Sequence, residues 1–370
     1  LPCPSVRFLW SIKGWYNPGM RKFIFAVVLM LSIVFIIGQF AELQALVETV
    51  QRGDWRFLAL ALIIQTAWLM NLAATYLVIF HSLGIEEKVE NLLLIATAAN
   101  FINIVAPSAG VGGMAVFIAE ARRRNYSPAR AAIASALHLF FDYLGFMVVL
   151  ALGMIVLFRR DHLTMVEITS SIILVSIASV LAVLLFLGMK SAEALGKALA
   201  WMARMVNRLV HPFTHRQYLS EARAHEFARD AAEGLHELRR QPGNMLAPIA
   251  LALVNKTLLI SVLLFVFLAF KVPVSAGTLV AGFSIGYLFL IVSPTPAGLG
   301  IVEGALTITL SSMYIPLEAA AVITLVYRGF TFWVPLLVGM IAFRMLGRPV
   351  PPSADPDDHE TLKNIDAGSI

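Results

Sequence analysis

Two charged residues stand deep inside long apolar runs of the sequence. Asp142 lies eleven residues into the run that starts at Ala131, and Arg328 lies nine residues into the run that starts at Ala319. At about 1.5 Å per residue, both fall well inside a helix that crosses a bilayer. A charge at the bilayer centre costs about 2.5 to 3.5 kcal/mol on insertion scales, so each side chain needs a partner or water.

Two interpretations of these charges stay open. In one, Asp142 and Arg328 approach each other and form a buried ion pair that locks two halves of the protein. In the other, they bind a lipid headgroup, because the planar guanidinium of Arg328 suits a phosphate, and Asp142 or Glu303 would meet a cationic group. His138 stands one turn before Asp142 on the same helical face, where it is placed to share its proton. For Glu303 the alternative role is to stabilise the first turn of a helix through the helix dipole.

Two stretches of helix breakers interrupt apolar sequence at bilayer depth. They read NFINIVAPSAGVGG at residues 100–113 and SPTPAGLGIVEG at residues 293–304. Irregular backbone at that depth is tolerated where it is buried in protein or lines a water-filled cavity. The alternative is that glycine and proline only permit close helix packing. Because both stretches combine proline with spaced glycines, we favour a cavity. Its predicted substrate-binding residues, besides those already named, are Asn100, Asn103, Pro107, Ser108, Gly110, Gly112, Gly113, Pro294, Thr295, Pro296, Gly298 and Gly300.

The composition is that of an integral membrane protein. Of 370 residues, 59% are hydrophobic and 14% charged, and the mean hydropathy is +0.81. Soluble domains are about half apolar and a quarter charged. No run alternates as a barrel strand would, so we predict an all-α polytopic fold with about six full spans. The predicted spans cover residues 23–40, 57–80, 131–158, 168–189, 245–270 and 319–343.

Basic residues predict how the chain threads the membrane. Positive residues collect in cytoplasmic loops, so Arg21 and Lys22 place the N-terminus in the cytoplasm of a cell with an inner membrane. The same rule makes the Arg122 to Arg124 cluster cytoplasmic, which forces residues 91–119 to enter and leave on one side as a re-entrant hairpin. Residues 275–312 form a second broken-helix hairpin, entering from the outer face. The C-terminus is predicted to be cytoplasmic as well.

The two broken stretches align at a shift of 188 residues. Residues 109–112 then lie over residues 297–300, and Tyr126 and Pro128 meet Tyr314 and Pro316. With the predicted topology, this makes an inverted repeat with halves at about 57–189 and 245–348. Discontinuous helices at the interface of inverted repeats mark the binding site of a transporter.

The rest of the chain gives weaker signals. Residues 1–348 are predicted to form one transmembrane domain, and residues 349–370, rich in Pro and Asp, a disordered tail. Between the halves, residues 190–243 carry nine Lys and Arg with amphipathic spacing, which favours a cytoplasmic segment near anionic inner-leaflet lipid. The net charge of +5 has the same explanation, so no nucleic acid is expected as a partner. A single cysteine, Cys3, excludes a disulfide framework and a cysteine metal cluster.

The broken stretches and the helices after them resemble a known family. APSAGVGG with YSPARA and LHLFFD, and SPTPAGLGIVEG with VITLVYRGFTFWVP, are similar to two signatures of the flippase-like transmembrane domain of lysylphosphatidylglycerol synthases. The resemblance implies a domain that moves aminoacylated phosphatidylglycerol between leaflets, in a stand-alone form without the aminoacyl-transferase domain. The chain departs from the usual pattern at Gly113-Met114 and at residues 136–140, where family members often carry charged residues.

These observations predict transbilayer movement of a phospholipid, with an aminoacylated or otherwise modified headgroup included, through a central polar cavity. We expect no catalysis, no metal and no cofactor, since no GxxxxGK[ST], HExxH or GxSxG motif is present. Two alternatives remain: a non-catalytic membrane partner of a separate lipid-modifying enzyme, and a membrane-embedded lipid-processing enzyme. The sequence leaves the lipid, the direction, the energy source and the oligomeric state open.

Overall fold

The protein is an all-helical membrane bundle. The computed structural model describes residues 48–105, 112–160, 164–214, 227–233, 235 and 246–347, and within these ranges it contains helices and no strand. In this part of the chain, five helices are long and apolar enough to cross a membrane, which confirms the predicted class. They match five of the six predicted spans, and the sixth, residues 23–40, lies outside the described residues. Their bounds are α2 Trp55–Ser82, α5 Pro128–Arg159, α6 Met165–Lys190, α9 Leu246–Ala269 and the segment Leu317–Leu346.

The outer surface of the long helices is apolar. Val148 and Ile155 of α5, and Val180 and Phe186 of α6, each keep more than half of their area exposed. A soluble protein rarely exposes large apolar side chains in such continuous stripes. These faces suit lipid chains, so polar contacts must be made inside the bundle.

Four shorter helices form two hairpin-like pairs. Within each pair the helices pack against each other, α3 on α4 and α10 on α11. A helix of twelve residues extends about 18 Å, which is less than the ~30 Å of a hydrocarbon core. The shorter member of each pair therefore does not span a bilayer. The four are α3 Val89–Val105, α4 Gly112–Arg123, α10 Ala276–Val292 and α11 Ile301–Ser312.

The two halves of the chain repeat the same turns. Gly84 ends the α2–α3 turn with φ 69°, and Lys271, 187 residues later, takes φ 55° between α9 and α10. Asn125 and Tyr314, 189 residues apart, do the same after α4 and α11. Each turn closes with a hydrogen bond from the next N–H back to the carbonyl five residues earlier, the Schellman arrangement: Ile85 to Phe80, Val272 to Phe267, Tyr126 to Ala121 and Ile315 to Leu310.

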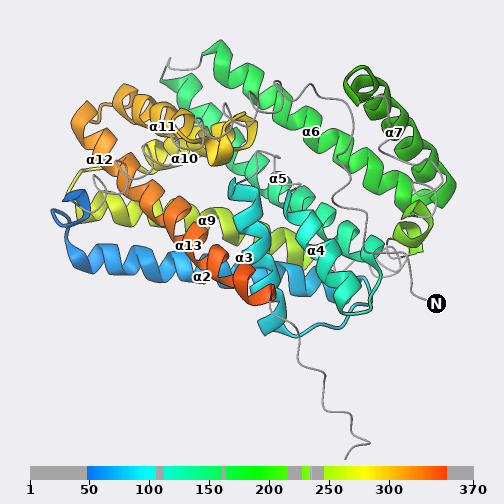
Figure 1. Cartoon of the computed structure of the whole chain (residues 1–370). Coiled ribbons are helices and arrows are strands. Elements are labelled where there is room, and N and C mark those ends of the chain that lie inside the picture. The colour runs from blue at the N-terminus through cyan, green and yellow to red at the C-terminus, as the bar shows by residue number, and fades with distance from the viewer. Residues whose placement is uncertain are drawn as a thin grey trace, which may run out of the picture.

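The packing of the helices also corresponds between the halves. Helices α2 and α9 run side by side, α3 packs on the C-terminal helix α13 (Val334–Leu346), and α10 packs on α5 (Figure 1). Both latter crossings use a glycine: Gly339 lies against Thr97, and Gly153 lies against Ser284. A Cβ at Gly339 would come within 2.8 Å of the Thr97 carbonyl oxygen, so close helix approach requires a residue without a side chain here.

The last predicted span is interrupted rather than continuous. Helix α12 (Leu317–Arg328) passes into a π-helical turn, η3 (Gly329–Trp333), before α13 begins. The cause is Pro335, which lacks an N–H and whose ring would collide with the carbonyl four residues earlier. Widening the preceding turn relieves that clash, and it falls directly after Arg328.

Helix α7 (Ala192–Thr214) is amphipathic, as predicted for the segment between the halves, and lies beyond the end of α6 (Figure 1). Leu195 and Ala200 are buried, whereas Trp201 and Met205 are more than half exposed. Most of residues 215–243 and all of the predicted tail lie outside the described part of the chain.

The glycine crossing predicts the effect of one methyl group. Gly339→Ala should destabilise the protein by about 1–3 kcal/mol because the helix backbone of α3 must move away. Gly304→Ala is the matched control, since a Cβ at Gly304 meets nothing within 4 Å and alanine favours a helix by about 1 kcal/mol. Thermal unfolding in detergent measures both. Equal midpoints for the two variants would contradict this account of the crossing.

Candidate functional site

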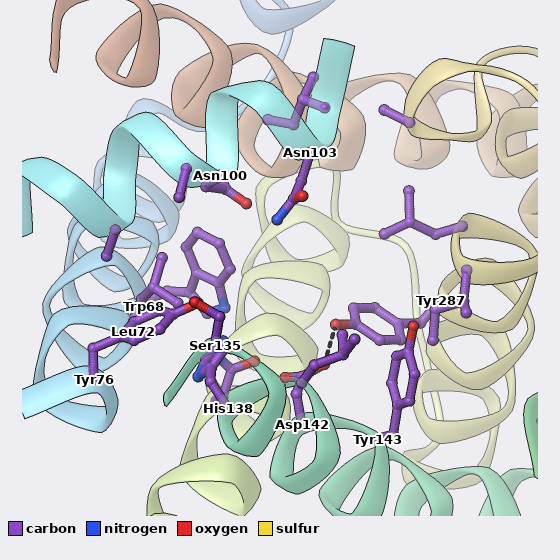
Figure 2. Close-up of a pocket in the computed structure, with 18 of the residues that line it drawn as sticks. Trp68, Leu72, Tyr76, Asn100, Asn103, Ser135, His138, Asp142, Tyr143 and Tyr287 are labelled. Carbon is purple, nitrogen blue, oxygen red and sulfur yellow. Dashed lines mark hydrogen bonds between the residues drawn. The ribbon is translucent and has the colours of Figure 1, made fainter. Parts of the chain in front are cut away.

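A polar cavity of about 190 Å³ lies inside the bundle. It is surrounded by α2, α3, α5, α9 and α10 and by the short turn η2 (Pro296–Gly298). One water needs only about 10–15 Å³, so the cavity has room for several waters or a small polar headgroup. Figure 2 shows Asn100 and Asn103 of α3 on one side of it and His138 and Asp142 of α5 on the other. Four aromatic residues complete its walls: Trp68, Tyr76, Tyr143 and Tyr287.

The carboxylate of Asp142 is held by two side chains from other helices. Nζ of Lys256 donates to Oδ1 of Asp142 at 2.6 Å, and the hydroxyl of Tyr287 donates to Oδ2 at 2.9 Å. The ammonium of Lys256 also lies 2.7 Å from the hydroxyl of Tyr287 and 4.0 Å from the centre of its ring. Helices α5, α9 and α10 are thus joined by one charged cluster at the wall of the cavity.

A glycine allows this cluster to form. A Cβ at Gly145 of α5 would lie 3.1 Å from the backbone of Ala252 in α9, so the two helices approach closely there. Asp142 stands three residues before Gly145, and Lys256 stands four residues after Ala252. One helical turn from the contact point, the two side chains therefore meet across the same crossing.

The lysine is the clearest departure from the sequence-based expectation. Lys256 opens the polar part of an apolar span, and a snorkelling side chain that reaches the membrane surface is the expected arrangement there. Instead Lys256 is 0% exposed and paired. The predicted contact between Asp142 and Arg328 is also wrong, because each forms its ion pair with a different residue.

Arg328 lies in a second cavity of about 130 Å³. Nε of Arg328 donates to Oε1 of Glu303 at 2.6 Å, and Nη2 donates to the carbonyl of Ala297 at 2.8 Å. The guanidinium also lies 5.0 Å from the ring centre of Phe332. The two cavities adjoin, since both are lined by Trp68, Ile104, Asn100, Tyr287, Leu290 and Ala297.

The second broken stretch forms the irregular backbone that was predicted. Ala297, Gly298 and Gly300 all have positive φ, at 48°, 71° and 78°. Ser293 and Thr295 hold this segment through their side chains, and the hydroxyl of Thr295 donates to the carbonyl of Leu299 at 3.1 Å. The carbonyl of Ala297, which the broken helix leaves free, is the one that Arg328 binds. The role of Arg328 in this structure is therefore to satisfy the hairpin backbone as well as Glu303.

The first broken stretch is joined by an asparagine. The N–H of Gly113 donates to Oδ1 of Asn103 at 2.5 Å, so α3 supplies a cap for the first turn of α4. A Cβ at Gly113 would lie 2.7 Å from the Asn103 amide nitrogen and 2.9 Å from the Ala99 carbonyl, which explains the glycine. Gly112 begins α4. Pro107, Ser108 and Gly110 lie outside the described residues.

Several buried polar atoms at the cavity have no partner among the described residues. They include Nε1 of Trp68, Nδ1 of His138 and Oδ1 of Asn255, and Oε2 of Glu303 beside the second cavity. The ring of His138 stacks on Tyr76 with centroids 4.3 Å apart. An unpaired buried polar atom costs about 1–3 kcal/mol, so a polar ligand or water that meets these atoms would be favoured.

The sequence located part of this site. Asn100, Asn103, His138, Asp142 and Thr295 line the first cavity, as a group predicted to bind substrate. Arg328 lines the second, with Glu303 as its partner, while Pro294, Pro296, Gly298 and Gly300 shape the loop beside it. Four important lining or partner residues were not predicted as site residues: Trp68, Asn255, Lys256 and Tyr287. The adjacent polar pair Asn255-Lys256 inside an apolar span was the signal for two of them.

A separate charged cluster lies at the ends of α3 and α4. Glu120 is only 4% exposed and pairs with Arg123 at 2.8 Å and with Arg124 at 3.4 Å, which also reaches Glu87. Arg123 in addition donates to the carbonyl of Leu346 at the end of α13. Neither cavity includes this cluster, so Glu120 has a structural role in tying helix ends together.

Together, a helical membrane bundle with a charged polar cavity at its centre defines the class of membrane-embedded proteins that handle polar groups at bilayer depth. Residues 23–339 match the family described as the lysylphosphatidylglycerol synthase transmembrane region, and the chain belongs to this family. No curated relative matches the chain. Within the described residues, no three His, Cys, Asp or Glu side chains are placed to hold a metal ion.

The buried ion pair predicts a pattern of stability. Lys256→Met should destabilise the protein by about 3–5 kcal/mol, because the Asp142 carboxylate loses its cation in a low-dielectric interior. The double variant Lys256→Met with Asp142→Asn removes both charges and should recover a large part of that loss. Unfolding in detergent measures both. A double variant no more stable than the single one would show that the two charges do not act as a pair.

Proposed function

We propose that this protein moves a phospholipid from one leaflet of the membrane to the other. The observation that carries the proposal is the pair of adjoining polar cavities inside an otherwise apolar bundle, with Asp142 at one and Arg328 at the other. A polar headgroup cannot cross hydrocarbon without a large free-energy cost, and a polar cavity at bilayer depth lowers that cost. Membership of a family named for a lipid synthase supports a lipid as the substrate.

Each cavity has a separate task in this proposal. Arg328 binds the phosphate, because its guanidinium carries five N–H donors and two of them are used by Glu303 and Ala297. The headgroup beyond the phosphate enters the larger cavity among Asn100, His138 and Asn255. The two acyl chains stay in the bilayer, against the apolar outer faces of the bundle.

The proposal includes an inverted repeat. Its support is the series of matched helices, the turns at Gly84 and Lys271 and at Asn125 and Tyr314, and the equivalent glycine crossings. In such folds the substrate site lies near the midplane where the two halves meet, and one half moves against the other. The charged cluster of Asp142, Lys256 and Tyr287 joins the halves at this interface.

The remaining parts of the proposal concern setting rather than geometry. The protein would reside in an inner membrane with both termini in the cytoplasm, following the distribution of basic residues. Helix α7 would lie near anionic inner-leaflet lipid, since its exposed face combines Trp201 with Lys197. The movement would involve no chemical change of the lipid, so we propose a transporter and not an enzyme.

Reconstitution into vesicles that carry a fluorescent phospholipid tests the function. Wild-type protein should make the inner-leaflet probe accessible to a quencher outside. The double variant Arg328→Gln with Glu303→Gln, which removes both charges together, should fold and slow this movement at least tenfold because the phosphate loses its cation.

The matched control is Arg344→Gln, since Arg344 is exposed on α13 and is remote from both cavities in the sequence of their lining residues. It should move lipid at the wild-type rate. No movement with wild-type protein at any lipid composition would overturn the proposed function and favour the role of a non-catalytic partner of a lipid-modifying enzyme.

A further inference from the structure

We propose that the headgroup accepted by the larger cavity is uncharged and rich in hydroxyl groups, such as a glycerol or a sugar on a phosphodiester. The inference rests on the proposed function, because it names the substrate class of the same site. It follows from the charges that the cavity walls have already neutralised and from the hydrogen-bonding atoms that they leave free.

Both charges at the cavities have a partner of opposite sign within the chain. Among the described lining residues, Asp142 is the acidic one at the larger cavity and Arg328 the basic one at the smaller cavity. Asp142 pairs with Lys256 and Arg328 with Glu303, each at 2.6 Å. The larger cavity therefore offers a cationic headgroup a carboxylate whose charge is already balanced.

Lys256 is not easily displaced by such a headgroup. It is 0% exposed, and its ammonium is bound by Asp142, by the hydroxyl of Tyr287 and by the face of the Tyr287 ring. An incoming ammonium that took over Asp142 would leave Lys256 charged and buried without a counter-ion, and breaking a buried pair in this way is strongly unfavourable. The exchange therefore selects against cationic headgroups.

The atoms left free suit hydroxyl groups. Oδ1 of Asn255, in a side chain that is 4% exposed, has no donor among the described residues, and Nε1 of Trp68 has no acceptor there. His138 adds an unpaired Nδ1 at the same cavity. A hydroxyl both donates and accepts, so a polyol meets all three atoms, whereas an ammonium can only donate. The amide groups of Asn100 and Asn103 on the opposite wall extend the same chemistry (Figure 2).

The shared walls allow phosphate and polyol to bind together. Trp68, Asn100 and Tyr287 line both cavities, so a phosphate at Arg328 places the next atoms of the headgroup at the entrance of the larger cavity. The phosphate keeps the Glu303 pair intact because Arg328 has N–H groups beyond the two already bonded.

Binding of short-chain lipids to the purified full-length chain in detergent tests the inference, with native mass spectrometry as the readout. The probes are phosphatidylglycerol and phosphatidylinositol, with uncharged polyol headgroups, against phosphatidylethanolamine and lysyl-phosphatidylglycerol, which carry an ammonium. The two polyol lipids should bind at least tenfold more tightly. Equal or tighter binding of either ammonium lipid, or no binding of any probe, would overturn the inference.

Two variants connect the preference to the free atoms. Asn255→Leu and Trp68→Phe should each weaken phosphatidylglycerol binding by about tenfold, and Trp68→Phe keeps the aromatic ring in case the first variant fails to fold. The matched control is Thr257→Val, because Thr257 is exposed on the same helix and bonds only to its own backbone at Leu253. Wild-type binding by both Asn255→Leu and Trp68→Phe would contradict the assignment.

The two proposals fail in different ways. Selective binding of polyol lipids without movement across vesicles would keep this inference and overturn the proposed function. Movement of all four lipids at equal rates, with equal affinities, would overturn this inference alone.

Discussion

A polar group inside the hydrocarbon of a membrane must find its partner within the protein, and this requirement shapes the centre of the bundle. The broken helix at residues 293–300 leaves the carbonyl of Ala297 without a helical partner, and Arg328 donates to it. Arg328 in turn needs an anion, which is Glu303, and the lone carboxylate of Asp142 needs a cation, which is Lys256. The cavities lie where these chains of necessity meet, because polar side chains that serve one another cannot be covered by lipid.

The scaffold repeats, but its charges do not. Turns and crossings recur at shifts of 186 to 191 residues, from Gly84 and Lys271 to Gly153 and Gly339. At a shift of 188, however, the positions matching Arg328 and Glu303 are Phe140 and Ala115. The common framework sets the position of the site, and the differences between the halves determine its chemistry. This division explains why a polar ion-paired hairpin faces an asparagine-capped one across the cavity.

The sequence predicted the class, the spans and the broken stretches well, because hydropathy and the placement of Pro and Gly follow directly from the bilayer. It also identified Asp142 and Arg328 as buried and in need of partners. The choice of partner was wrong for a physical reason: pairing depends on which faces of α5, α9 and α11 meet, and a glycine crossing at Gly145 sets that. Tyr287 could not be distinguished from an ordinary aromatic residue, since its role depends on a contact with α5 and α9 that no local pattern specifies.

The most direct measurement of the central claim is the reactivity of single cysteines toward a charged maleimide in bilayer nanodiscs, in a Cys3→Ser background. Only a thiolate reacts, and a thiol ionises only where water reaches it. A polar cavity at bilayer depth predicts that Asn100→Cys is labelled while Val148→Cys, on the exposed apolar face of α5, is not. An unreactive Asn100→Cys in a folded protein would contradict a water-accessible cavity between the two halves.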